Sequence, residues 1–444
     1  MRRASLGLLV ALIAGLVSVV ATSPPAYAAL GPGPFIKGTH PGVGASGPRD
    51  YFTYESSTTA GGARPLVVFL HGCTQNAKDI AIGTRFTELA EKRDFVVVFP
   101  EQPVTANGIN CWNWFEAAHQ SRGAGEPAVI AGITRDVLAA TGADASRVYV
   151  MGVSAGADMA MIMGATYPDV FAAVSGFAGC AYSTCADVTG TLAHRAMGPQ
   201  ARVMPAYLVQ GTVDPLNDFA MGETMARQWI GTNDLADDGA ANQSISPVPT
   251  RVEHIGFDAS ALAGVGKVGD PCVRNRQYPC AGALLGAKSY PYSIEHHADR
   301  KGCDVVDFWI VQGLSHDYPA GDPAGTFTDP IGPDITTAGY DFFLRHTLGS
   351  PCGGVKAASL TVPGSSSESQ FDESQADAGN GSGGTPGASP SRAAGGRLPA
   401  TGPSTSGPSG LAVFVGLLVL FGCRFVLRGP FRRPEGTNEA RSSG

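Results

Sequence analysis

Five short apolar runs constrain the fold of this chain more than any other feature of its sequence. They are residues 65–70, 95–99, 147–151, 205–209 and 306–311. Each run contains β-branched side chains without a polar alternation, a pattern typical of strands that are covered on both faces. The runs therefore predict a mainly parallel sheet rather than an antiparallel sheet with one face in water.

Helical patterns lie between these runs. Ile130, Ile133, Val137 and Leu138 occupy one face of a predicted helix, and residues 158–167 and 336–348 are further predicted helices. Alternating strands and helices predict an α/β fold with helices on both faces of the sheet.

The chain has 444 residues and a formal charge of −7, which excludes a simple cationic nucleic-acid binder.

The first 28 residues have the three parts of a secretory signal peptide. Arg2 and Arg3 precede an apolar stretch over residues 6–20, and Ala26 and Ala28 form a small-residue cleavage site. A membrane anchor is the alternative, but a bilayer span needs about 20 apolar residues. We therefore expect residues 1–28 to be removed and the mature protein to be secreted.

Residues 398–444 combine the pentapeptide LPATG, an apolar stretch over residues 411–423 and an arginine-rich tail. The combination resembles the sorting signal of Gram-positive cell-wall proteins. The resemblance implies that a sortase cleaves between Thr401 and Gly402 and joins Thr401 to peptidoglycan. A transmembrane C-terminal anchor is the alternative, but 13 residues span only about 20 Å as a helix, against about 30 Å of hydrocarbon.

Residues 354–397 are rich in Ser, Gly and Pro and contain one aromatic residue, Phe371. This composition favours a disordered linker. Residues 29–353 then remain as a single folded domain.

Eight of the nine cysteines lie in that domain, and an even number in a secreted chain indicates disulfides. Proximity in the sequence favours four pairs: Cys73–Cys111, Cys180–Cys185, Cys272–Cys280 and Cys303–Cys352. Other pairings stay open. A metal site is the alternative, but the chain has no CxxC pair and no HExxH motif. We expect neither a metal nor another cofactor.

The segment GVSAG follows the predicted strand 147–151 and opens a helical pattern. In this context a G-x-S-x-G motif exposes a nucleophilic serine at a sharp turn. Ser154 is therefore the candidate nucleophile, and the backbone N–H of Ala155 is a candidate donor to an oxyanion. The alternative is a glycine-rich turn with a serine that caps the helix.

A serine nucleophile needs a histidine base and a carboxylate that orients this base. In this chain the two follow the serine in the order Asp, His. Asp214 and His316 come just after the predicted strands 205–209 and 306–311, where sites form in open α/β sheets. The alternatives lie in less regular stretches: Asp218 for the acid, and His254, His296 or His297 for the base.

The loop after the first predicted strand supplies the second candidate oxyanion donor, the backbone N–H of Cys73. A Cys73–Cys111 disulfide would stiffen this loop and bring Trp112 and Trp114 to the site. The two tryptophans are candidate substrate contacts, with a place in the core as the alternative.

Six segments in this order resemble the esterase family of extracellular poly(3-hydroxybutyrate) depolymerases, which includes feruloyl and acetylxylan esterases. They are HGCTQ (71–75), CWNWF (111–115), RGAGEP (122–127), GVSAGADMA (152–160), GTVD (211–214) and GLSH (313–316). The resemblance covers residues 50–348 and implies an α/β-hydrolase fold and a triad of Ser154, Asp214 and His316, without a metal. Residues 218–300 depart from the family, so the ester substrate stays open.

These observations predict a serine esterase anchored to the cell wall that hydrolyses polyhydroxyalkanoate, feruloyl or acetyl esters. One alternative is an acyltransferase on the same fold that acts on envelope lipids. Another is a surface adhesin on an inert hydrolase scaffold, whose mark would be an incomplete triad.

Overall fold

The computed structural model describes residues 30–58, 61–183, 185–256 and 289–352. The predicted signal peptide, linker and sorting signal lie outside these residues, as do Cys272 and Cys280. Within the described ranges, no helix is both long enough and apolar enough to cross a bilayer.

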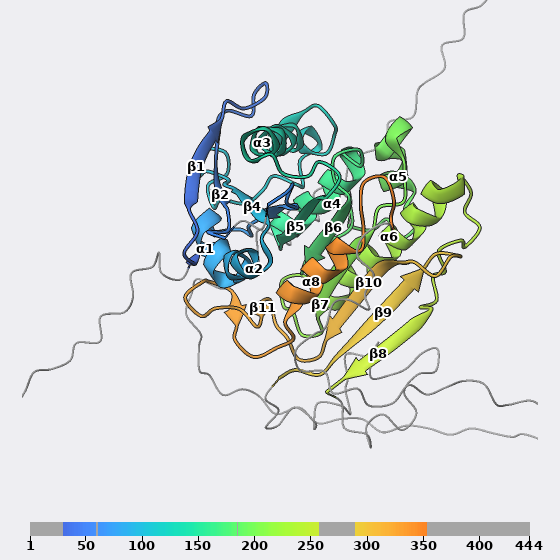
Figure 1. Ribbon diagram of the computed structural model, residues 1–444. Helices are drawn as coiled ribbons and strands as arrows, with labels where there is room; N and C mark the ends of the chain where they lie inside the picture. Colours follow the sequence, from blue (N-terminus) through green and yellow to red (C-terminus); the bar gives the residue numbers. More distant parts are fainter. Residues whose placement is uncertain (1–29, 59–60, 184, 257–288, 353–444) are drawn as a thin grey trace, which may run out of the picture. The chain divides into compact units, whose positions relative to one another are not determined.

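Ten strands form one sheet (Figure 1). They are β1 (Phe35–His40), β2 (Arg49–Tyr54), β3 (Leu66–Leu70), β4 (Val96–Pro100), β5 (Val148–Val153), β6 (Ala173–Phe177), β7 (Ala206–Gly211), β8 (Arg251–Ile255), β9 (Tyr292–Ala298) and β10 (Asp304–Val311). Their order across the sheet is β1-β2-β4-β3-β5-β6-β7-β10-β9-β8. The strands from β4 to β10 in this order are parallel, and the pairs at both edges are antiparallel. All five apolar runs are strands of the parallel part, as predicted.

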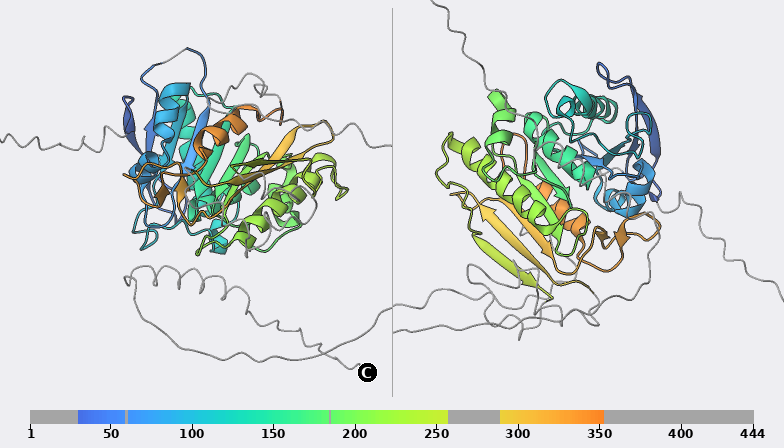
Figure 2. Two further views of the ribbon diagram at one scale, coloured as in Figure 1. Left: turned by 90° about the horizontal axis from the view of Figure 1, so that it is seen from below. Right: turned by 180° about the vertical axis from the view of Figure 1, so that it is seen from behind.

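Helices cover both faces of this sheet (Figures 1 and 2). They are α1 (Ala77–Gly83), α2 (Phe86–Arg93), α3 (Gly125–Thr141), α4 (Ala155–Thr166), α5 (Thr191–Met197), α6 (Phe219–Asp238) and α8 (Ile335–Leu344), with short 3₁₀ turns at Ala117–His119 and Gly198–Gln200. The three predicted helices correspond to α3, α4 and α8. A separate pair of two-residue strands, β11 (Tyr318–Pro319) and β12 (Thr328–Asp329), lies in the loop after β10.

Alternate residues of each central strand pack into two different cores. In β3, Leu66, Val68 and Leu70 pack in the core that includes α3 to α6. Val67 and Phe69 pack on the other face, with α1, α2 and α8. Because both faces are buried, no position of the strand faces water, and the apolar runs are continuous. The predicted α/β fold class, a mainly parallel sheet with helices on both faces, is confirmed.

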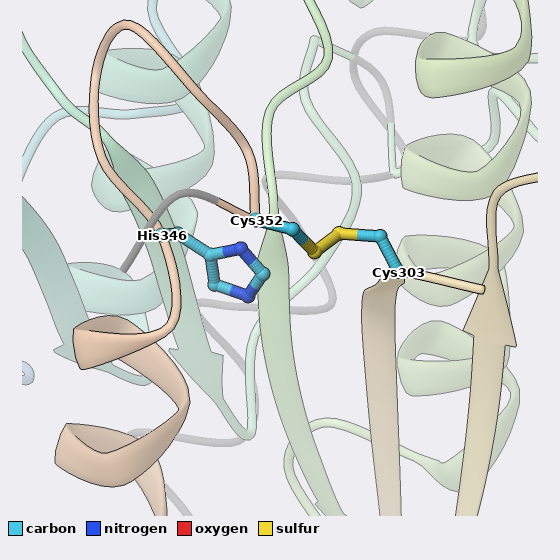
Figure 3. A group of neighbouring side chains, drawn as sticks. All are labelled: Cys303, His346 and Cys352. Atoms are coloured by element: carbon cyan, nitrogen blue, oxygen red, sulfur yellow. A yellow bond between two sulfur atoms is a disulfide. The ribbon is translucent and has the colours of Figure 1, made fainter. Parts of the chain in front are cut away.

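Three of the four predicted disulfides are present: Cys73–Cys111, Cys180–Cys185 and Cys303–Cys352. The last joins the residue before β10 to the chain after α8, and His346 lies beside it (Figure 3). These three side chains are residue types that bind metals. Their two sulfur atoms are bonded to each other, so this group offers no thiolates to a metal.

Among the three disulfides, the ones that close the longest and the shortest length of chain should contribute unequally to stability. Chain-entropy arguments give about 4 kcal/mol for Cys303–Cys352, with a sequence separation of 49, and about 2 kcal/mol for Cys180–Cys185, with a separation of 5. Urea denaturation of the Cys303→Ser/Cys352→Ser protein should therefore show the larger loss in free energy of unfolding. The Cys180→Ser/Cys185→Ser protein is the matched control, and an equal or greater loss there would contradict this ranking.

Candidate active site

Ser154 occupies a sharp turn between β5 and α4. Its φ of 53° and ψ of −126° are unusual for a residue with a side chain, and such strain persists only where the surroundings enforce it. Two glycines allow the turn. A Cβ atom on Gly152 would lie 2.2 Å from the Gly156 carbonyl oxygen, and one on Gly156 would lie 2.2 Å from the Leu70 carbonyl oxygen. The serine side chain stays partly exposed, as in a nucleophile turn.

Asp214 and His316 follow the neighbouring parallel strands β7 and β10 and are hydrogen-bonded to each other. The Nδ1 of His316 donates to Oδ2 of Asp214 over 2.7 Å. The other carboxylate oxygen of Asp214 accepts from the backbone N–H groups of Leu216 and Asn217, at 2.8 and 2.9 Å. The Asp214 side chain is fully buried, whereas that of His316 is 11% exposed. The carboxylate thus holds the proton on Nδ1 and leaves Nε2 as the acceptor.

Backbone hydrogen bonds align the carboxyl ends of β5, β6, β7 and β10. The N–H of Ser154 donates to Phe177 O at 2.9 Å, and the N–H of Ala178 donates to Val209 O at 3.0 Å. Next along the sheet, the N–H of Thr212 donates to Val311 O at 3.0 Å. All three predicted triad residues therefore lie on one rim of the sheet. No hydrogen bond joins Ser154 to His316 among the described residues, and such catalytic contacts commonly tighten when substrate binds.

Two backbone N–H groups beside Ser154 have no acceptor among the described residues, those of Cys73 and Ala155. Ala155 is the first residue of α4, where N–H groups lack helical partners. The Cys73 loop lies against the serine, because a Cβ on Gly72 would be 3.3 Å from Ser154 Cβ. Both predicted oxyanion donors are thus placed around the nucleophile.

His71 fixes the peptide group that contains the Cys73 N–H. Its Nε2 accepts from the N–H of Gln102 at 3.0 Å, so the ring proton is on Nδ1, which donates to Gly72 O at 2.8 Å. Complete burial lowers the pKa of His71 to about 4, so the ring stays neutral at physiological pH. Sequence reasoning did not select His71, although it is the first residue of the HGCTQ segment.

Glu126 anchors the loop that follows β4 and was also missed. This buried carboxylate accepts from the backbone N–H and the side-chain amide of Asn113, each at 2.8 Å. Arg49 lies 3.6 Å from the same carboxylate and offsets its charge. The only sequence signal was the position of Glu126 in the RGAGEP segment.

The prediction that Trp112 contacts substrate is wrong. Trp112 is 1% exposed, and its indole N–H donates to His71 O at 3.1 Å. This side chain therefore belongs to the core under residues 71–75, the oxyanion loop. Trp114 is partly buried and packs edge-on against Phe115 with ring centroids 5.7 Å apart. Its predicted contact with substrate stays a prediction.

The alternative acid and bases have other partners. Asp218 caps α6 by accepting from the N–H of Met221, and His254 contacts Ser293 Oγ at 2.8 Å. His296 binds Asp307 at 2.7 Å, and His297 binds the carbonyl of Ser246 at 2.8 Å. Asp214 and His316 are therefore the pair that the structure places on the rim with Ser154.

Comparisons with known proteins found similar sequences and structures. Residues 50–246 match the family model described as Esterase PHB depolymerase. Poly(3-hydroxyalkanoate) depolymerase C of Paucimonas lemoignei is 37% identical over 268 residues, which cover 60% of this chain and 58% of that protein. Feruloyl esterase B of Neurospora crassa is 39% identical over 119 residues, which cover 27% of this chain and 40% of that protein.

Related enzymes also include a probable acetylxylan esterase A of Aspergillus fumigatus, 36% identical over 28% of this chain and 34% of its own length. The chain thus spans about a third to three-fifths of the length of these curated relatives. Among solved structures, the acetyl xylan esterase from Aspergillus awamori has a TM-score of 0.46 at 20% identity, covering 63% of this chain and 94% of that one.

A buried carboxyl group lies one helical turn after Ser154 in the sequence. Asp158 is in the first turn of α4, and its carboxyl accepts from the N–H of Cys180 at 2.6 Å. Burial raises the pKa of Asp158 to about 8, so the group is mostly protonated at neutral pH. The protein therefore avoids a negative charge one helical turn from the serine.

This raised pKa predicts how stability depends on pH. Between the unfolded pKa near 3.8 and about 8, the folded state binds a proton that the unfolded state has lost, so stability falls as pH rises. The Asp158→Asn protein keeps the acceptor for Cys180 but cannot ionise. Its free energy of unfolding, relative to the unmodified protein, should rise by about 1.4 kcal/mol per pH unit between pH 5 and 7.

Urea denaturation at pH 5, 6 and 7 measures this difference. Asp144→Asn is the control. Burial acts to raise the pKa of Asp144, but hydrogen bonds from Ser146 and Arg147 outweigh it and the pKa is lowered. A constant difference between the Asp158→Asn and unmodified proteins across this range would show that Asp158 is ionised in the folded state.

Proposed function

We propose that this protein is a serine esterase that hydrolyses carboxylic esters through an acyl-enzyme on Ser154. The observation that carries the proposal is the Asp214–His316 hydrogen bond on the rim where Ser154 occupies its strained turn. The N–H groups of Cys73 and Ala155 beside the serine supply the remaining component, two donors for an oxyanion.

In the proposed reaction, Ser154 Oγ attacks the ester carbonyl carbon while His316 Nε2 takes the hydroxyl proton. The carbonyl oxygen becomes negative and is stabilised by the two backbone N–H groups. The leaving alcohol then takes the proton from His316 as the ester bond breaks. Water hydrolyses the acyl-enzyme by the same steps, and Asp214 stabilises the imidazolium in each half-reaction.

Exposed apolar side chains near the triad favour an ester with an apolar acyl group. Val213 precedes Asp214 and is 55% exposed, and Phe327, which is 48% exposed, lies edge-on to the His316 ring with centroids 6.4 Å apart. Ile109 is 36% exposed, and its carbonyl binds the N–H of Thr74 in the oxyanion loop. Polyhydroxyalkanoate and feruloyl esters have such acyl groups, and relatives are named for both.

We also propose that the protein is exported and anchored to the cell wall. The three disulfides support export, because such bonds persist mainly in oxidising compartments. The predicted signal peptide and the LPATG segment with its apolar and basic residues supply the rest of this proposal. Sortase and peptidoglycan would then be partners through Thr401.

Replacement of the nucleophile tests the proposed reaction. Ser154→Ala should lower kcat by roughly 10⁶-fold for p-nitrophenyl butyrate, methyl ferulate and a polyhydroxybutyrate film, because no acyl-enzyme forms. Product analysis with a sugar acceptor present separates hydrolysis from acyl transfer. An unmodified protein that cleaves none of these esters would refute the proposal.

Ser146→Ala is the matched control for this experiment. Ser146 precedes β5, at the strand end opposite to Ser154, and is exposed. Thermal denaturation should give both variants a Tm close to that of the unmodified protein. Activity lost equally in the two variants would point to misfolding rather than to loss of a nucleophile.

Deletion of residues 398–402 in the native host tests the proposed anchoring. Without the LPATG segment a sortase has no cleavage site, so immunoblots should find the protein outside the wall fraction. Deletion of residues 385–389, in the predicted linker, is the length-matched control and should leave the protein in the wall. Retention in the wall after the first deletion would contradict the sorting proposal.

A further inference from the structure

Gln75 is a buried residue that links two loops of the candidate site. Its Oε1 accepts from the N–H of Gly72 at 2.9 Å, and its own N–H donates to Gly72 O at 3.3 Å. Its Nε2 donates to the carbonyl of Thr326 at 3.1 Å. The Gln75 amide therefore joins the Gly72 loop to Thr326, which lies 251 positions after Gln75 in the sequence.

The first of these loops presents a predicted oxyanion donor. The Gly72 carbonyl accepts from His71 Nδ1 and from the N–H of Gln75, and the Gly72 N–H is held by the Gln75 side chain. Because the peptide group is planar, fixing the Gly72 carbonyl also fixes the direction of the Cys73 N–H, which points away from it.

The second loop carries the predicted base. Thr326 is held by Gln75 on one side, and by Asp79 of α1, which accepts from its N–H at 3.0 Å, on the other. The next residue, Phe327, packs against the His316 ring, and its carbonyl accepts from the N–H of Tyr318 at 2.8 Å. A shift of Thr326 would therefore move the surroundings of His316.

We propose that Gln75 is a positioning residue of the proposed esterase. Its amide sets the Cys73 N–H in register with the loop that contains His316, so the oxyanion donor and the base act on one carbonyl group. This inference rests on the proposed function. Gln75 touches neither the nucleophile nor the reacting atoms, and it acts through Gly72 and Thr326.

The Gln75→Leu protein keeps the side-chain volume and loses every hydrogen bond of the amide, with Gly72 and with the carbonyl and hydroxyl oxygens of Thr326. A misplaced oxyanion donor stabilises the transition state less but affects substrate binding little. We expect kcat to fall about 10- to 100-fold, up to the range found for loss of a whole donor, with KM nearly unchanged. Active-site titration with a fluorophosphonate gives kcat per reactive serine, so unfolded molecules do not enter the value.

Asn233→Leu is the matched control. Asn233 is also buried, accepts from the N–H of Met204 at 2.7 Å and donates to its carbonyl at 2.9 Å. Met204 lies at the amino end of β7, opposite to the rim. This variant should lose stability but keep kcat per titrated serine. Equal kcat per site in both variants would overturn the positioning role.

The Gln75→Glu protein separates the two hydrogen bonds of the amide. An ionised carboxyl still accepts from Gly72 but repels Thr326 O, whereas a protonated one donates to it. The titratable groups nearby are neutral His71 and Asp79, a second carboxyl bound to Thr326. The ratio of kcat in this variant to kcat in the unmodified protein should therefore rise as pH falls.

The ratio cancels any pH dependence of kcat that both proteins share. A pH-independent ratio, together with an unchanged kcat in Gln75→Leu, would refute the inference. Failure of the proposed function gives a different result, because the unmodified protein would then neither hydrolyse esters nor react with the fluorophosphonate.

Discussion

The buried carboxylate of Asp214 is the group on which the geometry of the rim depends. Burying a charge is costly unless donors surround it, and here two backbone N–H groups and the His316 ring do so. The same set of bonds fixes the loop after β7 to the loop after β10. Asn217, one of these donors, also holds the carbonyl of Ala178 through its side chain, which extends the arrangement to β6.

The sheet makes this arrangement rigid because each central strand is packed on both faces. The two cores leave the strands no alternative register, since a slip by one residue would exchange side chains between cores of different shape. The strain at Ser154 is maintained in the same way. Gly156 packs against the carbonyl of Leu70 in the neighbouring strand, so the turn cannot relax without moving β3.

The central strands, and the places of Ser154, Asp214 and His316 just after their carboxyl ends, could be predicted because these signals are local. An apolar run followed by Ser, Asp or His identifies a strand and its carboxyl end without knowledge of partners. Two kinds of strand could not be predicted in this way. The edge strand β1 has only partly exposed and exposed residues, and the central strand β6 contains Ser175 and Gly176. Trp112 was misassigned, and His71 and Gln75 were missed, because their hydrogen-bond partners are distant in the sequence.

The protonation of the buried groups suits a reaction that creates negative charge at Ser154. Burial keeps Asp158 protonated near neutral pH, and it raises the pKa of Asp317, next to His316, with the help of Asp329. A carboxylate within a few ångströms would oppose an oxyanion strongly where water is excluded. In the proposed reaction, the His316 ring lies between the Asp214 carboxyl group, to which it is hydrogen-bonded, and the reacting atoms. In the proposed reaction, charge forms only where a donor or cation already faces it.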